Sequence, residues 1–179
     1  SVLTCVAEPA PADAFRPPYT GGATSLRRLS DVDRERLPRL VPPSPVDDDT
    51  LETFAERLGR PWIDNLFYAF DAQVDTMAMY GRETGRVAGI ASLLVMLDLP
   101  AEQQAAQERL LVGLLQYGID LWGLVEAGYP GWYAHGGHGS GRKWPIVFAG
   151  TLFGDPAMSA PTISYPEVQF GEDMHTAFA

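Results

Sequence analysis

The chain has 179 residues, 46% of them apolar, and a formal net charge of −10 at pH 7. This length suits one domain with a hydrophobic core, and the acidic balance argues against nucleic acid and anionic membranes as partners. The lone Cys5 excludes an internal disulfide and a structural zinc site of several cysteines. The uncharged run 87–97 is shorter than the roughly twenty residues of a membrane span.

Residues 1–46 are rich in proline, which fixes φ and lacks an N–H donor. This segment therefore cannot form a long helix or a central strand. We expect an extended arm lying over a larger body, with a short helix near 31–36.

Residues 47–155 have the capping signals and apolar spacing of a helical domain. Asp47 to Thr50 supply a cap and carboxylates for the first helix, Gly59 ends it, and Pro61 suits the first turn of the next. Gly128 stops the longest helix. The predicted helices span 51–58, 62–70, 81–98, 101–127 and 143–153.

The helices predicted over 81–98 and 101–127 are apolar on most of their surface. Helices of this kind are buried on several sides. We therefore expect large apolar interfaces with the rest of a longer chain or with other subunits. Residues 156–179 carry further prolines and are interpreted as a tail continuing in a longer protein.

Two polar pairs stand on these helices. Gln116 and Asp120 share one face, where they line a cavity or satisfy a neighbouring helix end. Arg82 and Arg86 also share a face, and their default role is an ion pair with a carboxylate. The alternative is that they hold an acidic sugar.

The segment 132–144, WYAHGGHGSGRKW, is the most chemically distinctive part of the chain and holds two of its three histidines. Glycines allow close ligand approach, and free N–H groups before a helix attract anions. Arg142 and Lys143 add positive charge. A carboxylate or sulfate group fits this loop better than a nucleotide phosphate, because the spacing is not that of a P-loop.

His135 and His138 have three alternative roles. They could bind a metal, although no third ligand is apparent nearby, so we expect no metal or other cofactor. One could act as a general base or acid, with Tyr133 or Tyr129 as proton donor. In the third alternative the loop is only a tight turn and the histidines cap helix ends.

Aromatic side chains gather around this loop, which favours a carbohydrate cleft if they are exposed and plain packing if they are buried. They are Trp122, Tyr129, Trp132, Tyr133 and Trp144.

The runs Gly118-Ile-Asp-Leu-Trp122 and GGHGSGRKWPIVFAG over 136–150 resemble segments of large secreted bacterial proteins with helical toroids. Residues 50–155 are similar in pattern to the α-toroid domains of heparinase II/III-like and alginate-lyase-like polysaccharide lyases. The resemblance implies a mainly α fold, with helical hairpins forming an (α/α) toroid or part of one. It also implies secretion or a periplasmic location, and an acidic polysaccharide or oligosaccharide as partner.

Such lyases use a Tyr or His base and an Asn, His or Arg that neutralises the uronate carboxylate. No asparagine lies near the loop, since the only one is Asn65. The catalytic candidates are His138, His135, Tyr133 and Arg142. The substrate-binding candidates are Trp132, Trp144, Tyr129, Lys143 and Asp120.

The first functional hypothesis is therefore a carbohydrate-active domain with lyase-type proton abstraction, which requires an open groove and a solvent-accessible His138. The second is a non-catalytic extracellular binding or self-assembling structural subunit, which requires both loop histidines to be buried and hydrogen-bonded. A metal-dependent hydrolase ranks third.

Overall fold

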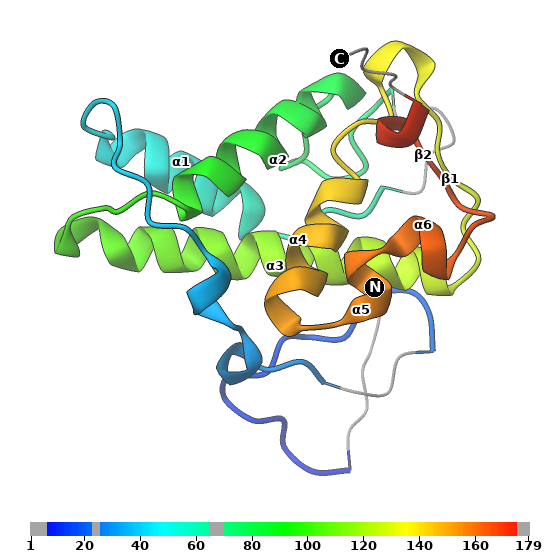
Figure 1. Ribbon diagram of the computed structural model, residues 1–179, viewed down its shortest axis with the longest axis horizontal. Coiled ribbons are helices and arrows are strands. Elements are labelled where there is room, and N and C mark those ends of the chain that lie inside the picture. The colour runs from blue at the N-terminus through cyan, green and yellow to red at the C-terminus, as the bar shows by residue number, and fades with distance from the viewer. Residues whose placement is uncertain (1–6, 23–25, 65–69, 175–179) are drawn as a thin grey trace.

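The computed structural model describes residues 7–22, 26–64 and 70–174, and this part of the chain is mainly α, as the sequence predicts (Figure 1). The helices are α1 (Asp48–Leu58), α2 (Gly81–Val95), α3 (Gln104–Glu126), α4 (Lys143–Phe153), α5 (Pro156–Ser159) and α6 (Pro161–Ser164). Short 3₁₀ turns are η1 (Leu29–Asp31), η2 (Arg34–Arg36), η3 (Ala101–Gln103), η4 (His135–Gly137) and η5 (Gly171–Met174). The strands β1 (Gly131–Trp132) and β2 (Gln169–Phe170) pair in parallel.

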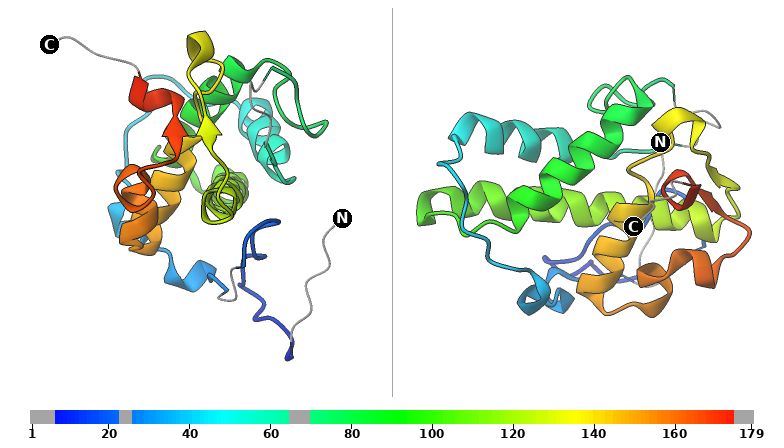
Figure 2. Two further views of the ribbon diagram at one scale, coloured as in Figure 1. Left: turned by 90° about the vertical axis from the view of Figure 1, so that its right-hand side faces the viewer. Right: turned by 45° about the horizontal axis from the view of Figure 1, so that its top comes forward.

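Helix α3 lies at the centre of the fold. Seen along its axis, α1 and α2 lie on one side, α4 to α6 on another, and the N-terminal arm passes across the remaining side (Figure 2). Leu110, Leu114, Leu115 and Leu121 on α3 are completely buried. The chain's own segments therefore cover most of the apolar surface of α3.

Close helix packing depends on a glycine of α3. A Cβ built at Gly118 would lie 2.3 Å from the backbone oxygen of Pro145 and 2.8 Å from Cβ of Ala149. Only glycine leaves room for α4 at this distance, so the crossing of α3 and α4 is set by one missing side chain.

Two helix predictions need correction. Trp62–Asp64 is not helical, and most of the remainder of the helix predicted over 62–70 lies outside the described residues. Trp62 is nevertheless buried, with 1% of its surface exposed. Helix α2 ends at Val95 rather than at residue 98, because residues 96–98 turn to meet the arm, where the Asp98 N–H donates to the Leu40 carbonyl at 2.8 Å.

The described part of the arm is extended apart from its 3₁₀ helices, of which η2 (Arg34–Arg36) lies within the short helix predicted near 31–36. Backbone bonds hold it to the body, including one from the Asp33 N–H to the Leu152 carbonyl at 2.8 Å. Among the described residues, no helix combines the length and the apolar character that a membrane crossing requires.

Acid should loosen one anchor of the arm. The Arg28 guanidinium and the Ser30 N–H bond to Asp13, and they lower the pKa of its carboxyl from 3.8 to about 2. Since the folded pKa is depressed, the stabilisation is present above pH 3.8 and is lost as the pH falls through about 2. We expect an NMR titration of the Asp13 carboxyl to give a midpoint near 2, with the amide signal of Phe15 changing alongside it.

In Asp13→Asn the amide signal of Phe15 should no longer respond in this pH window. An Asp13 midpoint at the ordinary aspartate value would show that the contact with Arg28 does not persist in solution.

Candidate functional site

The glycine-rich loop is fixed at its start by the pairing of β1 with β2. Gly131 has φ of 114°, and a Cβ there would lie 2.0 Å from the Gln169 oxygen. Trp132 is buried, stacks on Phe170 at 5.8 Å between ring centroids, and donates from Nε1 to the Asp64 carbonyl at 3.1 Å. Trp132, predicted to bind substrate, is therefore a core residue.

Arg142 is the most deeply buried cation among the described residues, with 1% of its surface exposed. Its Nε donates to the Asp64 carboxylate at 2.8 Å, and a second nitrogen pairs with the same oxygen. Its Nη1 donates to the carbonyls of Gly81, His138 and Ser140 at 2.7 to 3.0 Å. Arg142 thus ties the loop to α2 and to the segment before residue 65.

The predicted anion site at the start of α4 is present, and the chain fills it itself. The backbone N–H groups of Gly141, Arg142 and Lys143 donate to Oε1 of Glu172 at 2.7, 3.0 and 3.1 Å. The Lys143 ammonium pairs with Asp173. The carboxylate that the sequence led us to expect from a ligand comes from η5 of the same chain.

The two loop histidines differ in environment. His138 is buried between the rings of Phe70 and Tyr80, whose centroids lie 4.4 and 4.3 Å from its own, so the expected solvent access is not found. Its Nδ1 has no hydrogen-bond partner among the described residues. His135 is exposed and lies beside Tyr133 at 5.9 Å. The lyase hypothesis required a solvent-accessible His138, and the non-catalytic hypothesis required both histidines to be buried and hydrogen-bonded. The structure meets neither requirement in full.

Burial also affects Tyr129, which was a candidate proton donor and substrate contact. Desolvation raises the pKa of its hydroxyl to about 12, which keeps it protonated at neutral pH. Its ring packs against Trp132 at 5.0 Å.

Asp120 faces a cavity of about 550 Å³ between α1 and α3, together with Gln116 and Arg16. Of the two alternatives for the polar pair on α3, the structure supports the cavity. The carboxylate is only 3% exposed and forms a two-pronged ion pair with Arg16 of the arm, one bond of which measures 2.6 Å. Burial raises the pKa of the Asp120 carboxyl, and the pairing with Arg16 opposes that rise.

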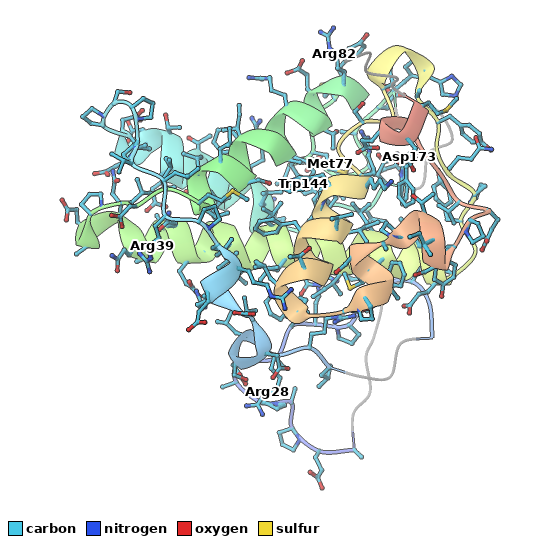
Figure 3. All side chains as sticks on the ribbon, in the orientation of Figure 1. Arg28, Arg39, Met77, Arg82, Trp144 and Asp173 are labelled. Carbon is cyan, nitrogen blue, oxygen red and sulfur yellow. The ribbon has the colours of Figure 1, made fainter. Side chains whose placement is uncertain are left out.

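A larger hollow lies elsewhere, on the outer face of α2. This groove has a volume of about 1060 Å³ and an apolar floor. Trp144, labelled in Figure 3, lies at the start of α4 and lines this groove. It is 40% exposed and donates from Nε1 to Ser92 Oγ at 2.6 Å. The uncharged residues that line the groove include Gly85, Gly89, Ile90, Leu93, Met96 and Trp144.

Charged residues stand at one end of the groove. Arg82 and Arg86 both pair with Glu83, at 3.8 and 2.5 Å, which is the default role expected for them. Each arginine side chain is more than 60% exposed. Glu172 also lines this end, and its Oε2 has no hydrogen-bond partner among the described residues.

The structure therefore separates the predicted site residues. Arg142 and Lys143 meet Glu172 at the start of α4, and Asp120 lies in the other cavity. Within the described part of the chain, Trp144 is the only predicted site residue that lines the apolar groove. The sequence did not reveal Asp64 as the partner of Arg142, or Glu172 as the acceptor at the start of α4. The one available signal was the carboxylate of Asp64 within a mostly apolar run.

Comparison with protein-family models, with curated proteins and with solved structures found no match to this chain. Among the described residues, no group of three or more His, Cys, Asp or Glu side chains could hold a metal ion.

Proposed function

We propose that this chain is a non-catalytic binding or assembly subunit that docks an α-helix of another polypeptide in the groove on α2. The observation that carries the proposal is the exposure of large apolar side chains around this groove. Leu93 is 59% exposed and Trp144 is 40% exposed, and both line a hollow wide enough for side chains of a partner. Contiguous apolar surface of this kind marks interaction sites on soluble proteins.

The form of the groove suits a helix. Its floor follows one face of α2 over nearly the whole length of that helix, from Arg82 to Met96. Gly85 and Gly89 have no side chains that would fill the groove, and Trp144 lines one of its sides. An amphipathic helix docks in such a groove through apolar residues at three- and four-residue spacing.

The glycine-rich loop then serves as a support for this surface. Arg142 joins the loop to α2 through the Gly81 carbonyl, and the loop residues Ser140 and Gly141 line the groove next to Gly85. The cations of the loop are occupied by Asp64 and Asp173, which favours a structural role for them over neutralisation of a uronate.

The test uses a fluorescently labelled amphipathic helical peptide with leucines on one face and glutamates on the other. Wild-type protein should bind it, and Leu93→Glu should weaken binding about ten- to hundredfold, because a buried leucine contact is lost and a charge is desolvated. Ile163→Glu is the matched control, since Ile163 is 83% exposed on α6, away from the groove. Fluorescence anisotropy is the measurement. Equal binding by all three proteins, or binding by none, contradicts the proposal.

The carbohydrate hypothesis keeps one specific observation as a second candidate. The exposed indole of Trp144 shares the groove with the exposed Arg82 and Arg86, a combination that can stack on a sugar ring and pair with its acid group. Under this proposal the helices belong to an (α/α) toroid continued by further hairpins, in a secreted or periplasmic protein. Release of an unsaturated, ultraviolet-absorbing product from an acidic polysaccharide would support the lyase and overturn the non-catalytic proposal.

A further inference from the structure

Residues 16–20 of the arm form a strap across α3 that is held through polar contacts. The Arg16 guanidinium pairs with both carboxylate oxygens of Asp120 and lies 3.8 Å from the centroid of the Tyr19 ring. The Arg16 carbonyl accepts a hydrogen bond from Gln116 Nε2 at 3.2 Å. Asp120 therefore already holds a guanidinium group, which the chain supplies from its own arm.

The strap is held less firmly than the part of the arm next to it. Phe15, just before the strap, is buried against Phe153 with 5.5 Å between ring centroids, and its N–H donates to the Arg27 carbonyl at 2.8 Å. No residue of the strap itself is fully buried. The strap can therefore lift from α3 at the cost of its polar contacts, while Phe15 stays in the core.

Hollows flank the strap on two sides. Arg16 lines the cavity of about 550 Å³ between α1 and α3. Tyr19 and Thr20 line a second hollow of about 490 Å³. Arg60 and Pro61 line both hollows, so the two are neighbours. Release of the strap would therefore widen the entrance to the cavity instead of uncovering packed core.

The buried charge of Asp120 decides which ligand could hold the strap open. Asp120 is 3% exposed, and its ion-pair partner among the described residues is Arg16. Once the strap lifts, the carboxylate is left as an unpaired buried charge, which is strongly unfavourable. A ligand shifts a conformational equilibrium only through a higher affinity for one of the states. A ligand that stabilises the open form at neutral pH must therefore bring a positive charge to Asp120.

We propose that the cavity between α1 and α3 binds a small organic cation, and that the strap closes this site with Arg16 as its built-in occupant. The amidinium, guanidinium or ammonium group of the ligand takes the place of Arg16 at Asp120. Its apolar part lies against Leu58, Trp62 and Val112, which line the cavity. The volume of the cavity falls in the range of small-molecule sites. This site is separate from the groove on α2 and does not depend on the proposed function.

Benzamidine is the test ligand, because its flat amidinium offers a carboxylate two parallel N–H groups, as arginine does. In isothermal titration calorimetry at pH 7, Arg16→Ala should bind benzamidine, and wild type should bind it about tenfold or more weakly, since Arg16 competes. Arg27→Ala is the matched control and should bind like wild type, because it removes a similarly exposed arginine of the same arm and keeps the Asp120 pair. The proposal is overturned if Arg16→Ala binds no better than wild type, or if adding Asp120→Asn leaves that binding unchanged.

Labelling of a thiol in the cavity tests the strap without Arg16→Ala, which leaves a buried charge unpaired. Val112→Cys in a Cys5→Ser background places the thiol on the cavity wall. Its reaction with a neutral maleimide should become about tenfold faster when Asp120→Asn is added, because the strap then opens more often. Adding Arg27→Ala instead should leave the rate unchanged. Equal rates in all three proteins would show that the Arg16 pair does not hold the cavity closed, and would overturn the proposal.

Discussion

Replacing Asp64 with asparagine is expected to lower the free energy of unfolding by about 3–5 kcal/mol. The side chains of Asp64 and Arg142 are 0% and 2% exposed, so the substitution leaves a buried guanidinium with no opposing charge. The loss is a large part of the roughly 5–15 kcal/mol that stabilises a typical domain. Urea denaturation followed by circular dichroism measures it.

Glu83→Gln is the matched control, because it also removes a carboxylate from arginine partners, but at an exposed site. Exposed pairs contribute about 1 kcal/mol or less. If Asp64→Asn costs no more than Glu83→Gln, the pair is open to water in solution.

Replacing Gly118 with alanine is expected to destabilise the fold by about 1–3 kcal/mol through overpacking. The new methyl group would lie within 2.3 Å of the Pro145 oxygen, so α3 and α4 must move apart. This loss should exceed the gain of roughly 1 kcal/mol that alanine normally brings to a helix interior. Urea denaturation is again the measurement.

Gly89→Ala is expected to change stability in the opposite direction. It makes the same chemical change inside α2, but at a position where the added Cβ meets nothing within 4 Å. At protein concentrations low enough to avoid self-association, it should raise stability by up to about 1 kcal/mol. A gain in stability for both glycines would contradict the close crossing of α3 and α4.

Local signals explain why much of the helical fold could be predicted. The apolar run after Lys143 predicts 143–153, which is the observed α4, and Gly154 ends it in a left-handed conformation with φ of 65°. Asp47 caps α1 through the Thr50 N–H at 2.7 Å, as expected. Such signals act within one turn of helix, so they are readable along the sequence.

The contacts of the candidate site depend on residues far apart, and this is why the sequence did not reveal them. Arg142 pairs with Asp64 across 78 positions, and Arg16 pairs with Asp120 across 104. The composition does carry a general hint. With 23 acidic residues for 13 Lys and Arg, most cations can be expected to find a carboxylate in the folded chain.

That pairing has a consequence for how molecules approach the protein. Eleven of the thirteen cationic side chains are held in internal ion pairs, and the net charge of −10, which already counts these cations, acts at long range. A polyanion in dilute buffer is therefore repelled before it reaches Trp144, and two copies of the chain also repel one another. At about 0.15 M salt the repulsion fades beyond roughly 8 Å. Added salt then speeds the encounter of two copies, the opposite of its effect on complexes steered together by opposite charges.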